Sequence, residues 1–292
     1  MHRILHYEIA EQLGEGKNGL SWSAVDSALQ RAVVIKELRS PVVRREEWRT
    51  RFLSLMDLLN RLENTRIGRF YALEQSDGRW FLARQYVDGQ SVADMTRAAP
   101  VEYPRWLTLA LEMARTLKSI HDAGLVHGNV TSSNVLIDPQ GEPILVDAGL
   151  GLAEPGPSNE EQRAYLAPEL LRGEATTPSS DLYALGVVLF HLLTGRPPRS
   201  SAPLIFEEYS EQQVPGVARL LLGRLVATAP GERFGSADEL IVTIQAVMSL
   251  GAEPVSTPES KKWSPTPRQY IMISVLVLLL IILWLVITSN PR

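Results

Sequence analysis

Three glycines near the N-terminus have a spacing that can bind phosphate groups. Gly14, Gly16 and Gly19 form the pattern G-x-G-x-x-G. Glycine lacks a Cβ atom, so its backbone N–H groups can approach an anion closely. The pattern alone is weak, and a dinucleotide-binding site requires it to open a helix. Here an alternating strand pattern follows at residues 20–25, which predicts a β-hairpin instead.

A single lysine follows in the next strand pattern. Lys36 comes directly after Val33, Val34 and Ile35. A lone lysine in a strand is usually a solvated edge charge, because lysine is seldom buried without a partner. The flanking apolar residues favour a lysine that points into a cleft. A glycine hairpin with a strand lysine beneath it is a phosphate-binding arrangement.

The elements that position these residues begin with short apolar runs separated by turn residues. The sequence Asp77-Gly78 between two such runs predicts a β-hairpin. Residues 44–62 interrupt the strands with apolar side chains spaced three or four apart, which predicts one helix. The first part of the chain should therefore form a small sheet with one helix.

After Gln90 the long patterns are helical. Residues 104–122 and the apolar run 182–193 predict two long helices, the second opening behind a capping cluster at residues 179–181. We therefore expect an α+β fold with two lobes, a β-rich one at about 1–88 and a helical one at about 89–250.

Further motifs follow the glycines and Lys36 in a fixed order, and together they resemble a protein kinase of the bacterial Ser/Thr type over about residues 7–250. They are HGNVTSSN at 127–134, Asp147-Ala148-Gly149, Ala167-Pro168-Glu169, a helix pattern with Asp181 and Gly186, and Arg233. Each motif could arise by chance, but five in order at suitable spacing are specific to that family.

The resemblance implies a nucleotide site and a scaffold. In the family, Lys36 would contact the α- and β-phosphates of ATP, and Asn134 and Asp147 would hold Mg²⁺ under the three glycines. Glu169 and Arg233 would be structural partners, and Asp181 would occupy its usual place in the long helix. The expected cofactors are ATP and Mg²⁺.

Residues 127–134, which align with the catalytic loop of the family, depart from the family pattern. Asn129 stands where the family has the aspartate that accepts the proton of the substrate hydroxyl, and Thr131 replaces a lysine. Gly128 replaces the arginine that pairs with a phosphorylated activation segment, and Gln162 replaces a threonine that bonds the aspartate. Loss of a general base lowers a rate by roughly 10²–10⁴. No catalytic residue is expected to be active.

The small lobe departs as well. Leu55 falls where the family has the glutamate that pairs with the strand lysine, while Asp57 faces another side of the helix. Glu46 or Glu47 would reach Lys36 only after a shift of the helix. Arg84 falls at the rear of the adenine pocket, where it must either neutralise an acidic group or obstruct the pocket, since an unpaired buried charge is unfavourable.

The C-terminal part has a different composition. Residues 270–288 contain no charge, proline or glycine, which predicts one transmembrane helix followed by a short tail at 289–292. Residues 251–269, rich in Pro, Ser and Thr, form the expected juxtamembrane linker. Positive charges before the span favour a cytoplasmic location for the domain at 1–250. We expect a single-pass membrane protein.

Composition excludes several classes of function. The 292 residues contain no cysteine, which excludes disulfides and thiol catalysis, and the net charge of −4 gives no sign of nucleic-acid binding. Three hypotheses remain: a membrane-tethered pseudokinase that binds a nucleotide and an unknown cytoplasmic or membrane protein, an active but atypical Ser/Thr kinase, and a docking scaffold without ligand.

Overall fold

The computed structural model describes residues 3–16, 19–39, 41–153, 160–198 and 209–250. The chain divides into a compact unit at Met1–Gly251 and a second unit at Ala252–Arg292. The predicted linker, transmembrane helix and tail lie outside the described residues. Among the helices that are described, none has the length and apolarity needed to cross a bilayer.

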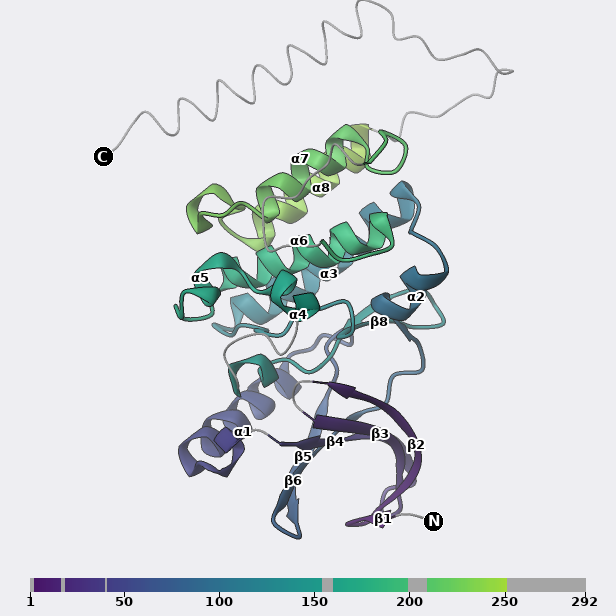
Figure 1. Cartoon of the computed structure of the whole chain (residues 1–292), viewed down its shortest axis with the longest axis vertical. Helices are drawn as coiled ribbons and strands as arrows, with labels where there is room; N and C mark the ends of the chain where they lie inside the picture. Colours follow the sequence, from purple (N-terminus) through teal and green to yellow (C-terminus); the bar gives the residue numbers. More distant parts are fainter. Residues whose placement is uncertain (1–2, 17–18, 40, 154–159, 199–208, 251–292) are drawn as a thin grey trace, which may run out of the picture. The chain divides into compact units, whose positions relative to one another are not determined.

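The first part of the chain forms a six-stranded antiparallel sheet in the order β1-β2-β3-β4-β6-β5 (Figure 1). Its strands are β1 (Arg3–Ile4), β2 (Tyr7–Gly16), β3 (Gly19–Asp26), β4 (Arg31–Leu38), β5 (Phe70–Ser76) and β6 (Arg79–Gln85). The predicted turn between the last two is confirmed, and both of its residues, Asp77 and Gly78, have positive φ. That geometry matches the twist of the strands it joins.

The two faces of this sheet differ in chemistry. Side chains alternate between faces along a strand. One face of β4 and β6 belongs to an apolar cluster made of Val33, Ile35, Phe81, Ala83, Ile4, Tyr7 and Ala24. On the other face Lys36 lies opposite Leu82, and Val34 lies opposite Arg84. Lys36 and Arg84 are therefore diagonal neighbours on one face.

One helix packs on the sheet, as predicted. A 3-10 turn at Pro41–Arg44 leads into α1 (Glu46–Arg61), which starts and ends within two residues of the expected bounds. Phe52, Met56 and Leu59 are its buried residues. Their spacing of three and four places them on one face, toward the core.

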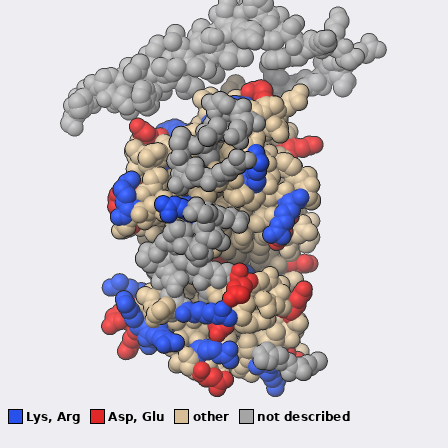
Figure 2. Space-filling model, viewed as in Figure 1, with Lys and Arg blue, Asp and Glu red and all other residues tan. Residues whose placement is uncertain are grey.

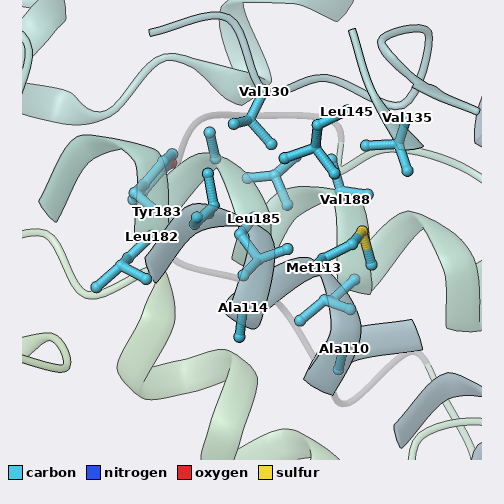
Figure 3. Packing of buried hydrophobic residues seen from close by; sticks show 14 of the residues in the cluster. Ala110, Met113, Ala114, Val130, Val135, Leu145, Leu182, Tyr183, Leu185 and Val188 are labelled. Carbon is cyan, nitrogen blue, oxygen red and sulfur yellow. The ribbon is translucent and has the colours of Figure 1, made fainter. Parts of the chain in front are cut away.

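The second lobe is helical, and its long helices share one apolar core. Its elements are β7 (Gln90–Ser91), α2 (Val92–Ala98), α3 (Tyr103–Asp122), β8 (Val135–Ile137), β9 (Pro143–Leu145), η2 (Leu150–Ala153), α4 (Glu160–Tyr165), α5 (Pro168–Leu171), α6 (Pro178–Thr194), α7 (Gly216–Leu225), η3 (Pro230–Glu232) and α8 (Ala237–Leu250). Figure 3 shows Met113 of α3 and Leu185 and Val188 of α6 packed together beneath Val130 and Leu145. These contacts support the loops that carry the polar motifs.

The predicted start of α6 is wrong. The N-cap is Thr177, whose side chain accepts from the backbone of Ser180, while the Ser180 side chain accepts from the backbone of Thr177. The helix begins at Pro178 and stays buried from Ser180 to Leu193. A proline at the first helical position needs no hydrogen bond there. Because Thr177 is the cap, the Asp181 side chain is not used as one and binds another segment instead.

Candidate functional site

Two cations meet one carboxylate between the lobes. Lys36 Nζ lies 2.5 Å from Asp147 Oδ2, and Arg84 Nε lies 2.8 Å from Asp147 Oδ1. The side chains of Lys36, Arg84 and Asp147 are 12%, 10% and 3% exposed. We call these three residues the cleft triad. Because each cation faces a different oxygen, both oxygens of the carboxylate are occupied.

The contact of Arg84 with Asp147 is an ion pair without hydrogen-bond geometry. Arg84 Nε and Asp147 Oδ1 are both buried, and neither makes a hydrogen bond despite their short separation. Arg84 also donates from Nη1 to the carbonyl of Gln85 at 2.9 Å. Of the two roles expected for Arg84, neutralising an acidic group is the one observed.

The electrostatic balance of the triad keeps Asp147 ionised. Burial alone would raise the pKa of Asp147, but the charges of Lys36 and Arg84 outweigh it and lower that pKa to about 2. Two cations and one carboxylate leave a formal charge of one positive unit. The triad is therefore a place where a further cation is repelled and an anion is attracted.

The backbone of Asp147 is held in a left-handed conformation, with φ of 61°. Few residues other than glycine adopt this conformation, and aspartate is one of them. Asn129 Nδ2 donates to the carbonyl of Asp147 at 3.0 Å, and Gly149 N donates to the carbonyl of His127 at 2.7 Å. Residues of the loop at 127–134 thus hold this left-handed backbone in place.

The amides of the catalytic loop bind backbone. Besides the bond from Asn129 to Asp147, Asn134 Nδ2 donates to the carbonyl of Asn129 at 2.9 Å. The side chain at 129 therefore acts as a hydrogen-bond donor, a role that a carboxylate cannot take. Thr131 is half-buried, and its carbonyl accepts from the backbone of Asn134 at 3.0 Å.

Gly128 has a structural use. Its φ is 65°, which glycine adopts without steric strain. Asp181 accepts from the backbone N–H groups of both His127 and Gly128, at 2.7 and 2.8 Å, and His121 Nε2 lies 3.0 Å from the same carboxylate. The long helix therefore anchors the catalytic loop through Asp181.

Helix α1 gives Lys36 no carboxylate. Leu55 lies against Gly149, where a Cβ atom would overlap the Leu55 side chain. Asp57 is exposed and pairs with Arg61 at 2.7 Å. Glu46 and Glu47 are exposed at the start of the helix. The apolar Leu55 thus faces the Asp147–Gly149 turn where a glutamate was expected from the resemblance.

The three glycines lie in the predicted hairpin. Gly14 is opposite Ser21, and Gly16 is opposite Gly19 at its end. Gly19 has φ of 126°, and a Cβ atom there would overlap the carbonyl of Glu37. A Cβ atom at Gly14 would meet nothing within 4 Å. Gly19 is therefore required for packing, whereas the backbone near Gly14 is open to a ligand.

The scaffold residues meet in the large lobe. Arg233 donates from Nη1 and Nη2 to the two carboxylate oxygens of Glu169, at 2.6 and 2.7 Å, with both side chains almost fully buried. Burial raises the pKa of Glu169, but the bonds from Arg233 bring it below its usual range. Arg233 also donates to the carbonyl of Ser179.

Gln162, which replaces the threonine expected from the resemblance, lies half-buried in α4.

One buried polar network was not anticipated from the sequence. Tyr165 donates to Ser132 at 2.9 Å, and Ser132 lies 2.8 Å from His191 Nδ1. His191 Nε2 lies 3.0 Å from Thr96, whose hydroxyl donates to the carbonyl of Val92. Burial lowers the pKa of His191 to about 4. A histidine inside an otherwise apolar helix was the signal that could have revealed it.

The Pkinase model, the protein kinase domain, matches residues 7–230. The chain belongs to the protein kinase family. The serine/threonine-protein kinase PknJ of Mycobacterium tuberculosis is 30% identical over 279 residues, covering 87% of this chain and 47% of that protein. PrkC of Bacillus subtilis is 27% identical over 258 residues, covering 82% and 40%. The crystal structure of the Mycobacterium tuberculosis PknI kinase domain has a TM-score of 0.67, with 26% identity over 84% of this chain and 97% of that one.

These comparisons establish the fold and the family, but the curated relatives are longer than this chain. The chain spans about half the length of the curated relatives it matches. The two-lobed protein kinase fold predicted from the sequence is confirmed.

Protein kinases generally use ATP and Mg²⁺, so the fit of the metal to this cleft can be examined. Mg²⁺ binds oxygen ligands, yet Asp147 directs both of its carboxylate oxygens at cations. Asn134 donates from its amide nitrogen to the carbonyl of Asn129, which leaves its amide oxygen for an ion. Within the described residues no group of three or more acidic or histidine side chains could hold a metal ion. As these side chains lie, the carboxylate of Asp147 does not fit the ion, because both of its oxygens face cations.

Proposed function

We propose that this protein is a membrane-tethered pseudokinase, a kinase-fold module that binds a nucleotide and acts through a protein partner. The observation that carries the proposal is the hydrogen bond from Asn129 Nδ2 to the carbonyl of Asp147. The position that should take a proton from an alcohol holds a neutral amide whose nitrogen is already committed. Without a general base there, phosphoryl transfer falls by roughly 10²–10⁴.

Neighbouring substitutions support the same function. Gly128 and Thr131 supply no charge to the catalytic loop, and Leu55 supplies none beside Asp147. A phosphoryl-transfer site works by placing charged groups around the transferring phosphate. The catalytic loop has lost these groups together, while Asp181, Glu169 and Arg233 still hold the scaffold.

Nucleotide binding is the second part of the proposal. The hairpin backbone near Gly14 is open, and the cleft triad carries a net positive charge. Backbone N–H groups of a glycine hairpin and a buried positive cluster are both suited to phosphate groups.

Membrane attachment is proposed from sequence alone. The uncharged run 270–288 is long enough for a transmembrane helix, and the linker 251–269 would keep the domain close to the membrane. We propose that the domain acts by binding a protein partner at the cytoplasmic face of the membrane. On the face of the domain drawn in Figure 2, acidic and basic side chains are interspersed, which is unlike the basic surface of a nucleic-acid-binding protein.

An active Ser/Thr kinase is the alternative, and the comparisons favour it. The relatives named above are called serine/threonine-protein kinases, and Lys36, Asn134 and Asp147 are all present here. A docking scaffold without ligand is favoured by one observation, the burial of Arg84 inside the cleft.

Radiolabelled ATP decides between the first two functions. The full-length chain in detergent micelles is assayed for autophosphorylation and for transfer to a generic protein substrate, beside Lys36→Ala and Asp147→Ala. We expect the same background signal from all three. Transfer by the unaltered chain that either substitution abolishes would mean that the protein is an active kinase.

Thermal unfolding with increasing ATP tests the third function, because a ligand that binds only the native state must raise the midpoint. A rise that saturates supports nucleotide binding. A midpoint that stays constant up to millimolar ATP, with and without Mg²⁺, would mean that the domain binds no nucleotide and would support the docking scaffold.

A further inference from the structure

We infer that Arg84 takes the place of the divalent cation at Asp147, so that the cleft binds a nucleotide in its metal-free form. The inference rests on the proposed nucleotide binding and specifies the ligand as a free polyphosphate anion. It concerns Lys36, Arg84 and Asp147, the three members of the cleft triad.

Strand register fixes the position of Arg84. Lys36 and Arg84 lie on the same face of β4 and β6, two residue pairs apart along the ladder. Both side chains extend from this face toward Asp147 in the other lobe. An arginine at this diagonal position therefore reaches the carboxylate without any change in the backbone.

Charge then excludes a metal. Asp147 supplies one negative charge, and Lys36 and Arg84 already supply two positive charges within 2.8 Å of its oxygens. A divalent ion at the same carboxylate would meet two buried cations and find no free oxygen. Like charges repel strongly where burial limits screening.

The net positive charge of the cleft triad favours an anion. Arg84 Nε–H is buried, makes no hydrogen bond and lies in the cleft. A buried donor without a hydrogen-bond partner is unfavourable, and a guanidinium group binds phosphate oxygens through more than one N–H. A phosphate group that approaches the triad would neutralise the remaining positive charge. Mg²⁺ complexed to the nucleotide would remove that advantage.

The experiment compares one nucleotide with and without metal. Thermal unfolding of the full-length chain in micelles is followed with a non-hydrolysable ATP analogue, once in EDTA and once in excess Mg²⁺. The variants are Arg84→Met, which removes the proposed substitute for the metal, and Arg79→Met on the same strand. Arg79 is 56% exposed and 3.8 Å from Glu37, which makes it a matched control outside the cleft.

We expect the unaltered chain and Arg79→Met to bind the analogue about 10-fold more tightly in EDTA than in Mg²⁺, seen as a larger rise of the midpoint. Arg84→Met should reverse this order, because Asp147 Oδ1 becomes available to the ion. A larger rise in Mg²⁺ than in EDTA for the unaltered chain would overturn the inference. So would an Arg84→Met variant that keeps the preference for EDTA.

A second measurement separates failure of this inference from failure of nucleotide binding. If the analogue has no effect under either condition, nucleotide binding is wrong, and the double-mutant cycle of Asp147→Asn and Arg84→Met decides the role of Arg84. Asp147→Asn removes the carboxylate that two buried cations share. We expect it to lower the unfolding midpoint by about 10 °C in the chain that keeps Arg84, and by less than half of that in the chain with Arg84→Met. Equal losses in both backgrounds would show that Arg84 does not neutralise Asp147.

Discussion

Two buried ion clusters, one within the large lobe and one between the lobes, differ in how their charges are matched. In the large lobe, Glu169 and Arg233 pair one to one through two hydrogen bonds. In the cleft, Lys36 and Arg84 share Asp147, and the contact of Arg84 lacks hydrogen-bond geometry. The first cluster is complete within the protein, whereas the second is left with excess positive charge.

This difference shows which parts of a kinase fold can change independently. The Glu169–Arg233 pair joins α5 to the end of η3 and to α6, and every oxygen of the carboxylate is used. Scaffold contacts of this kind need no ligand. The cleft was expected to hold Mg²⁺, and Arg84 has changed its charge balance without disturbing the strands around it. Chemistry at the cleft can therefore change while the scaffold stays the same.

The largest effect is expected from Arg233→Met. It leaves the buried carboxylate of Glu169 without its partner, so we expect a loss of about 3–5 kcal/mol in the free energy of unfolding. Denaturant unfolding at pH 7 measures it. Arg172, which is 56% exposed and pairs with Glu174 at the surface, provides the control Arg172→Met, with a loss below about 1 kcal/mol. Similar losses for both variants would contradict the assignment of Glu169 and Arg233 as a structural pair.

Acid should weaken the scaffold before it weakens the cleft. Burial lowers the pKa of His191 to about 4, below the ordinary value of 6.5, so the unfolded state takes up the proton first. The stabilisation from neutral His191 is complete above about pH 6.5 and is lost as the pH falls toward 4. The charges on Asp147 persist until the pH approaches about 2. We expect about 2 kcal/mol of stability to be lost between pH 7 and pH 5.

Denaturant unfolding of His191→Gln across this range checks that expectation. The variant should lose most of the pH dependence above pH 5, whereas His6→Gln, at a side chain that is 40% exposed, should retain it. Protonation of Nδ1 would turn an acceptor into a donor facing Ser132, which is the physical cause. An unchanged pH profile in His191→Gln would mean that other groups titrate.

Gly128→Ala should have a smaller effect, about 1 kcal/mol, because alanine is strained at φ of 65°. The matched control is Gly223→Ala in α7, where a Cβ atom meets nothing within 4 Å and alanine should stabilise the helix slightly. Thermal unfolding of both variants provides the comparison. A neutral or stabilising Gly128→Ala would show that Asp181 does not hold this backbone in the left-handed conformation.

The smallest effect is expected from Arg84→Met, within about 1 kcal/mol of the unaltered chain. Asp147 keeps Lys36 as a partner, and methionine fills much of the same space without leaving a buried charge. Denaturant unfolding without nucleotide measures it. A loss as large as that of Arg233→Met would break the comparison, since both arginines would then be structural to the same degree.

The sequence predicted the fold because local patterns and turn residues agree with it. The Asp77-Gly78 hairpin, the amphipathic helix α1 and the long helix α3 appear at the expected residues, and α6 appears with an earlier start. The residue at which a helix starts was harder to predict from the sequence. Several residues near 178 could cap α6, and packing decides which of them does so. Thr177 became the cap, and Asp181 was drawn to the catalytic loop.

The sequence by itself determined which chemical groups the cleft contains: Asn129 instead of a carboxylate, no charge at positions 128 and 131, and an arginine at 84. Only the tertiary structure decided how they are used. Asp147 and Arg84 are 63 residues apart by number and meet because the two lobes pack together. Pairing between distant side chains depends on distances that local patterns do not specify. For that reason the sequence left two roles for Arg84, and the fold selected one.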